Sequence, residues 1–190
     1  MMRFPSRAAA ALAAFALALA GPAAAQKNPA DEPHTRLANP PANMPSEAQI
    51  VGFLDEVDQS GIDASQMALE RSKNDDVLDF ANRMIAHHEE NRRKTGELGI
   101  SASRGELASK FKEKRKATAS RLGRLEGPAF DRAYMAAMVD DHVAALDKLD
   151  RKAIPAAKTG ALARHLQDTR PAVEEHLEEA RRIKASLGAR

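Results

Sequence analysis

The sequence of 190 residues contains no cysteine and no tryptophan, and its aromatic residues are one tyrosine and six phenylalanines. Without cysteine, the chain forms no disulfide and carries no thiolate nucleophile. So few aromatic rings leave no platform on which nucleic-acid bases could stack. Charges of the two signs nearly balance, with a formal net charge of +2. The sequence therefore predicts no nucleic-acid partner.

Long apolar runs are absent after the first part of the chain. Residues 1–7 carry Arg3 and Arg7, residues 8–20 are apolar, and three alanines precede Gln26. This order is typical of a secretory signal peptide over residues 1–25, and the apolar run is too short to span a membrane well. Arg3 and Arg7 account for the whole formal charge of +2. After removal of residues 1–25, the mature chain would therefore be close to neutral. We expect an exported protein without a transmembrane segment, periplasmic in a Gram-negative host.

The segment 26–45 has small and polar residues between five prolines and no periodic apolar pattern. This composition predicts a disordered, Pro-rich tether. From residue 46 to residue 187 the pattern changes, because apolar residues recur at intervals of three and four. We expect this second part to be one helical domain.

Five helices are expected in that domain, and none of its segments has the alternation of a strand. Four are long and amphipathic. The fifth, around residues 104–124, has a thin apolar stripe and is otherwise strongly basic, which is typical of a solvated outer face. The predicted helices span approximately residues 46–72, 74–96, 101–126, 127–155 and 161–187. The order predicts an all-α, ferritin-like four-helix bundle, with the basic helix as a crossover between the second and third long helices.

One motif occurs twice, with an aromatic residue, a methionine and a histidine at i, i+4 and i+8 along a helix. The first copy contains Phe80, Met84 and His88, and the second contains Tyr134, Met138 and His142. This spacing places all three residues near one face of each helix. His176 lies on the apolar face of the last helix. The aromatic and methionine residues are typical of a core, whereas the three histidines are either buried core residues or ligands.

Several runs resemble the exported family known as domain of unknown function 4142, often described as predicted outer membrane proteins. The matching runs are residues 68–72, Phe80 to His88, Phe130 to Tyr134, Met138 to His142, and Pro171 to Leu177. The resemblance implies a ferritin-like bundle in which the motif histidines are His88, His142 and His176. The sequence departs from the family pattern at Ala86 and His87, where an acid usually precedes the histidine. It also has Gly61, Asp63 and Ala64 where members often carry a glutamate.

Residues 84–88 also resemble the M-I-x-H-H signature of small exported helical proteins associated with copper. Neutral imidazoles suit zinc and copper, and the thioethers of Met84 and Met138 would favour Cu(I). His87 and Asp140 flank the candidate ligands. The Glu-x-x-His signature of di-iron proteins is absent, because Ile85, Val139 and Val173 stand three residues before the histidines.

Three hypotheses follow for the function. The first is a non-catalytic exported helical module that acts in the envelope or in a stress response. The second is binding of a copper or zinc ion through His88, His142 and His176. The third, weaker hypothesis is a ferritin-like oxidase. The sequence contains no Gly-rich phosphate loop and no recognisable catalytic triad, so we expect no enzyme, and the expected partners are an envelope protein or a metal ion.

Overall fold

The computed structural model describes residues 44–189, and all regular secondary structure within this range is helical. The predicted signal peptide and all but the last two residues of the predicted tether lie outside the described residues. The helices are α1 (Glu47–Arg71), α2 (Asp75–Glu97), α3 (Glu106–Leu122), α4 (Gly127–Lys148), α5 (Ile154–Ala156) and α6 (Gly160–Gly188), with a π-helical turn at Leu149–Ala153 after α4. The all-α prediction is therefore confirmed. Within residues 44–189, no helix is long and apolar enough to cross a membrane.

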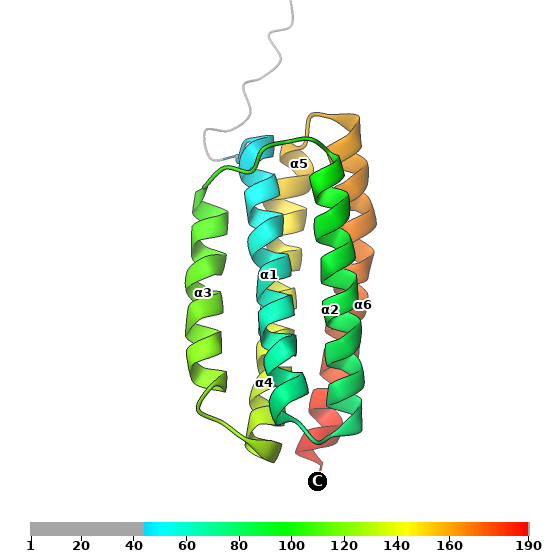
Figure 1. Ribbon diagram of the computed structural model, residues 1–190. Coiled ribbons are helices and arrows are strands. Elements are labelled where there is room, and N and C mark those ends of the chain that lie inside the picture. Colours follow the sequence, from blue (N-terminus) through cyan, green and yellow to red (C-terminus); the bar gives the residue numbers. More distant parts are fainter. Residues whose placement is uncertain (1–43, 190) are drawn as a thin grey trace, which may run out of the picture. The chain divides into compact units, whose positions relative to one another are not determined.

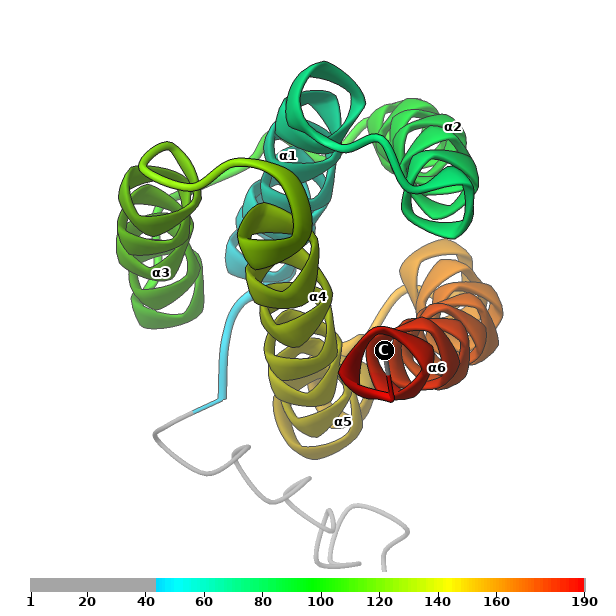
Figure 2. The same ribbon diagram turned by 90° about the horizontal axis from the view of Figure 1, so that it is seen from below.

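The four long helices α1, α2, α4 and α6 form a bundle, and α3 lies outside it against α1 (Figure 2). α1 packs on α2 and α4, while α6 packs on α4 and α2. Neighbouring helices of the bundle run in opposite directions (Figure 1). α3 carries the chain back along the outside of α1, so α2 and α4 run in the same direction.

The helix starts follow their local capping signals. Ser46 forms a capping box with Gln49, in which the Gln49 side chain accepts a hydrogen bond of 2.9 Å from the Ser46 backbone. The Asn74 side chain accepts from Val77 N at 3.3 Å and caps α2. α4 has a proline in its first turn, where the missing N–H has no helical partner to lose.

α3 ends at Leu122, with Gly123 as its C-cap, and it begins later than the predicted helix 101–126 because the segment before it contacts α1 as a non-helical chain. Ser103 N donates a hydrogen bond of 2.9 Å to Ala48 O. Gly52 permits this approach, since a Cβ atom at this position would lie 2.3 Å from the Ser103 carbonyl oxygen. The connection between α2 and α3 is thereby fixed across α1.

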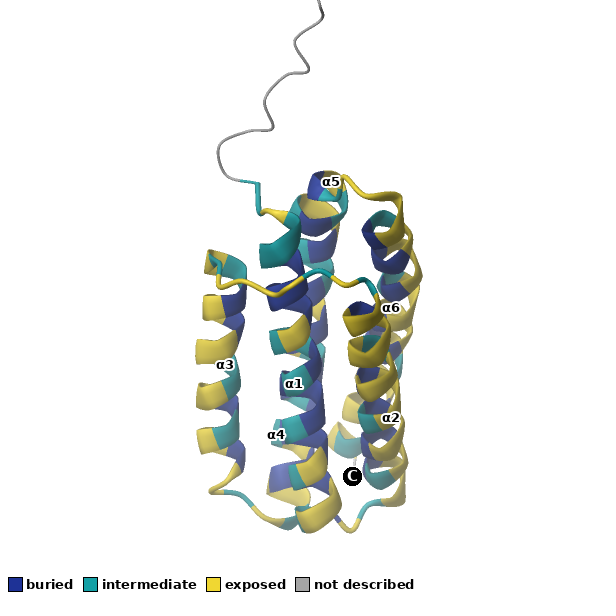
Figure 3. Cartoon of the chain, turned by 45° about the horizontal axis from the view of Figure 1, so that its top comes forward, coloured by how far each residue is buried: buried dark blue, intermediate teal, exposed yellow. Residues whose placement is uncertain are grey.

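The buried faces of the helices point into the bundle (Figure 3) and form two apolar clusters. The cluster at one end includes Phe80, Met84, Tyr134 and Met138, each at most 1% exposed, which confirms that the motif residues belong to the core. The cluster at the other end includes Phe53, and both α1 and α6 contribute to both clusters. Along α4 and α6 a histidine stands between the residues of one cluster and those of the other, so a polar layer separates the two halves of the core.

The basic side chains of α3 do more than face solvent. Arg115 forms an ion pair with Asp63 of α1 at 2.7 Å, and Lys114 forms one with Asp141 of α4 at 2.7 Å. Phe111 packs edge-on against Phe53 with ring centroids 5.1 Å apart. Partly exposed ion pairs of this kind typically contribute at most about 1 kcal/mol each, so α3 is held chiefly by its narrow apolar stripe.

Candidate metal centre

His88, His142 and His176 come from three different helices and meet in the polar layer. Their ring centroids lie 6.1 Å (His88–His142), 5.8 Å (His88–His176) and 5.5 Å (His142–His176) apart. One ring nitrogen from each residue lies within 4.8 Å of the corresponding nitrogens of the other two. All three residues are only 5% exposed. The arrangement is a compact, buried set of imidazoles with the size of a metal site.

Each of the three rings has one nitrogen engaged in a hydrogen bond. His88 Nδ1 contacts Asp58 Oδ1 at 2.8 Å, and His142 Nδ1 contacts the Met138 carbonyl oxygen at 2.7 Å. His176 Nε2 contacts His87 Nδ1 at 2.7 Å. The remaining nitrogens, His88 Nε2, His142 Nε2 and His176 Nδ1, are buried without a hydrogen-bond partner among the described residues. Buried polar atoms without a hydrogen-bond partner are rare in proteins.

These hydrogen bonds determine which nitrogens carry protons. A carboxylate and a carbonyl only accept, so His88 and His142 donate from Nδ1 and, when neutral, keep a lone pair on Nε2. Burial, and then the proximity of His88, lower the pKa of His142 to about 4. Burial, and then the neighbouring histidines, lower the pKa of His176 to about 3. At neutral pH these two rings are therefore uncharged, as metal ligands must be.

Two residues of α1 shape the site, and the sequence interpretation missed their roles. Asp58 is 2% exposed and accepts from both His88 and Asn91 Nδ2, the latter at 2.9 Å. Gly61 makes room for the His88 ring, because a Cβ atom there would lie 2.3 Å from His88 Nε2. The sequence did hold a signal for this pair. Leu54, Asp58 and Gly61 follow each other at intervals of four and three residues, which places all three on the same inward face of a helix.

The predicted flanking residues divide into two groups. His87 is exposed but contacts His176 directly, with stacked rings 5.0 Å apart, and Met138 lines a small cavity beside His88 and His142. Met84, by contrast, packs in the apolar cluster and lines neither cavity next to the histidines. Asp140, the flanking acid, is exposed; its neighbour Asp141 is buried, and burial raises the pKa of its carboxyl.

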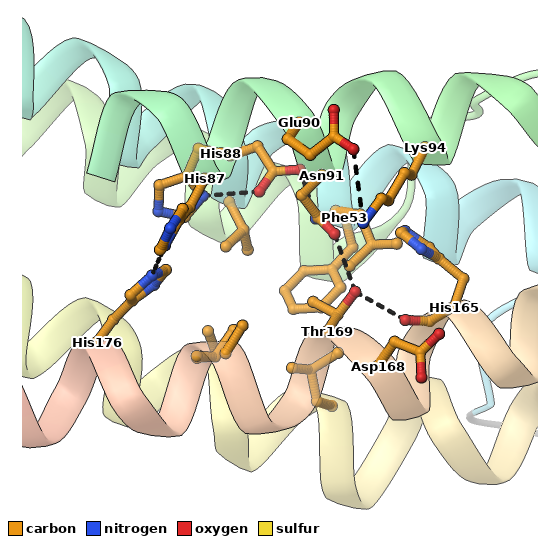
Figure 4. Close-up of a pocket in the computed structure, with 17 residues that line it drawn as sticks. Phe53, His87, His88, Glu90, Asn91, Lys94, His165, Asp168, Thr169 and His176 are labelled. Atoms are coloured by element: carbon orange, nitrogen blue, oxygen red, sulfur yellow. Dashed lines mark hydrogen bonds and ion pairs between the residues drawn. The ribbon is translucent and has the colours of Figure 1, made fainter. Parts of the chain in front are cut away.

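A cavity of about 310 Å³ adjoins the histidines and extends between α2 and α6 (Figure 4). Its polar wall is a hydrogen-bonded chain, in which Thr169 Oγ1 donates to Asn91 Oδ1 at 2.9 Å and Asn91 donates to Asp58. Farther along, His165 Nε2 contacts Thr95 Oγ1 at 2.8 Å. Asn91, Thr95 and Thr169 continue the spacing of three and four residues along the buried faces of α2 and α6, whereas His165 was not singled out from the sequence. The polar layer thus continues from the histidine cluster toward solvent.

The family model described as Domain of unknown function (DUF4142) matches residues 32–183. The chain belongs to this family. The match contains all three clustered histidines and confirms the resemblance inferred from the motifs. No curated protein and no solved structure matches this DUF4142 chain. Its function is therefore best inferred from the geometry of its own residues.

The metal-free protein is expected to lose stability in mild acid. Well above pH 6.5, His142 is neutral in both the folded and the unfolded chain. Between pH 6.5 and about pH 4, the unfolded chain binds a proton at His142 and the folded chain does not, so falling pH favours unfolding. Below about pH 4, His142 is protonated in both states and this loss is complete. Across this window His142 alone is expected to contribute a loss of about 3 kcal/mol. His176 extends the loss to about pH 3. Urea unfolding between pH 7.5 and 4.5 measures the effect.

A variant with His142→Leu and His176→Leu separates this effect from the titration of carboxylates. The slope of unfolding free energy against pH should be clearly shallower in the double variant. Equal slopes in the two proteins would show that the two histidines are not held neutral by the fold.

Proposed function

We propose that this protein binds one transition-metal ion, of the zinc or copper type, through His88 Nε2, His142 Nε2 and His176 Nδ1. Two observations support the proposal. One nitrogen of each ring lies within 4.8 Å of a nitrogen of each of the other two rings, and each ring has one buried nitrogen without a partner while its second nitrogen is hydrogen-bonded. An unsatisfied buried polar group costs roughly 1–3 kcal/mol. Three such groups in one place are best explained by a ligand that satisfies them together.

The donor set favours particular metals. Neutral imidazole is a borderline ligand that suits zinc, copper, iron and nickel, whereas magnesium and calcium prefer oxygen. The partners of the other nitrogens, Asp58, the Met138 carbonyl and His87, are the type of outer contact that orients ligating histidines. Three protein ligands leave a tetrahedral ion with one further position. The only buried carboxylate hydrogen-bonded to a cluster histidine, among residues 44–189, is Asp58, which gives oxygen-activating iron chemistry little support.

The experiment is a titration of metal-free protein with Zn²⁺ and Cu²⁺, monitored by calorimetry. We expect one equivalent of either metal to bind, copper more tightly than zinc, with a raised melting temperature. His165→Ala is a matched control, because His165 is also a buried histidine of α6 but lies outside the cluster; it should retain the site. Several weak equivalents, or no saturation, would contradict the proposal.

Export would place this site in the periplasm. The basic, apolar and small-residue order of residues 1–25 supports removal of a signal peptide, and envelope or stress-related metal handling is a role compatible with that location. Mass spectrometry of the exported protein is expected to find an N-terminus at Gln26. A mature protein that still began at Met1 would contradict export by this route.

We also infer that the bundle is ferritin-like. The support is the parallel course of α2 and α4, which α3 makes possible by returning the chain along the outside (Figure 1). This is the connection of bundles with one long crossover. An experimental structure in which α2 and α4 ran in opposite directions would contradict the inference.

A further inference from the structure

The cavity beside the histidines has the form of a small-molecule site. Two of the three candidate ligands, His88 and His176, lie on its wall. The polar residues of the wall near them are Asp58, His87, Asn91 and Thr169, and most of the lining area is apolar. The apolar lining residues are Phe53, Leu54, Val57, Ala145, Leu149, Ala172 and Val173. Mostly apolar walls with a few convergent polar groups are typical of sites for small molecules.

The charge of the centre calls for one anion. Three neutral imidazoles cancel none of the charge of a divalent ion, and Asp58, acting through His88, supplies a single negative charge. A monoanion in the fourth position would bring the buried centre to neutrality, which matters because uncompensated buried charge is costly. At the far end of the cavity, the rim carries Glu90 and Asp168 against Lys94 alone. This excess of acids disfavours a ligand with a second negative group.

Of the two cavities described beside the centre, the larger one admits more than a water molecule. The second cavity, between His88 and His142, has a volume of about 10 Å³, which is space for about one water molecule. The large cavity of about 310 Å³ has room for at least about ten water-sized groups, since a water molecule takes roughly 30 Å³ of the liquid. Its length along α2 and α6, from His176 toward His165 (Figure 4), suits an extended chain.

We propose that this cavity binds a small organic monoanion, a monocarboxylate with an apolar chain and about ten non-hydrogen atoms. Its carboxylate takes the fourth position at the metal held by His88, His142 and His176. Its chain lies between α2 and α6 against Phe53, Val57 and Leu149. The assignment rests on the proposed metal site and adds the class of ligand that the site accepts.

The test uses Co²⁺-loaded protein, whose visible absorption reports a change of ligand at the metal. Octanoate and acetate serve as probes, because they share the carboxylate and differ in the chain. Because the chain of octanoate has six more methylene groups to bury against the apolar wall, octanoate is expected to bind at least about 30-fold more tightly than acetate. The metal-free protein is expected to bind octanoate at least about 10-fold more weakly than the Co²⁺-loaded protein.

Two variants locate the chain of the ligand. Val57→Phe fills the half-buried apolar wall, and Ala172→Phe obstructs the cavity from its exposed rim, where an added ring does not overpack the core. A variant that retains the Co²⁺ spectrum is folded around the metal. In such a variant, acetate should bind as before while the advantage of octanoate falls below about 3-fold.

The outcomes separate the two proposals. If Co²⁺ does not bind, the metal site itself is wrong, and this inference falls with it. If Co²⁺ binds but acetate and octanoate bind equally, the cavity is not the ligand site, and the assignment is overturned while the metal site stands. Equal binding of octanoate with and without metal would likewise overturn it.

Discussion

Replacing His142 with alanine is expected to reduce the affinity for Zn²⁺ or Cu²⁺ at least about 100-fold. Loss of hydrogen-bonding partners around ligating histidines costs about 10–100-fold in metal affinity, and removal of a ligand itself should cost more. His142 is also the ligand from α4, so the ion would be left with ligands from α2 and α6 only. Calorimetric titration of the variant measures the loss.

The same variant distinguishes a metal ligand from a structural histidine. The ring carries a buried nitrogen with no partner, so its removal relieves one unfavourable contact while it creates a cavity. We expect the metal-free variant to keep its helical circular dichroism and to melt close to the metal-free wild type. A large drop in melting temperature, with metal binding intact, would show that His142 serves the core alone.

Replacing Gly61 with alanine is expected to remove metal binding almost as completely, although Gly61 is not a ligand. The added Cβ atom would lie 2.3 Å from His88 Nε2, which is far inside contact distance. The ring must move, but its hydrogen bond to Asp58 and its burial prevent a small adjustment. Because ligand geometry must be held closely, we expect a loss of about 100-fold in affinity.

Stability should respond differently from affinity in this variant. Alanine gains about 1 kcal/mol over glycine within a helix, while overpacking costs about 1–3 kcal/mol, so the net change in the metal-free protein is small. Gly96→Ala in α2 is the matched control, since a Cβ atom there meets nothing within 4 Å. It should bind metal as the wild type does. Unchanged affinity in Gly61→Ala would mean that the close approach to His88 has no role in the site.

The sequence predicted much of this fold because its helical signals are local. The capping box at Ser46, the cap at Asn74 and the proline at the start of α4 all act within one turn. The repeated motif placed His88 and His142 on inward faces in the same register. The start of α3 was less predictable, because residues 101–105 contact residues of α1 that lie far away in the sequence.

The site was only partly predictable for the same reason. Asp58 lies 30 residues from His88 in the sequence, and no spacing rule connects them. The contact between His87 and His176 spans 89 residues. Whether the flanking Asp140 or its neighbour Asp141 is buried depends on the rotation of α4 about its own axis, which a stripe of apolar residues defines only coarsely. Contacts between helices decide these features.

The most direct test of the metal centre is an anomalous-scattering crystal structure of protein loaded with one equivalent of Zn²⁺. We predict a single strong peak within about 2.0–2.1 Å of His88 Nε2, His142 Nε2 and His176 Nδ1, the normal length of a zinc–nitrogen bond. Asp58 and the Met138 carbonyl should keep their hydrogen bonds to the outer nitrogens. A peak elsewhere, with the three nitrogens still lacking partners, would contradict the account.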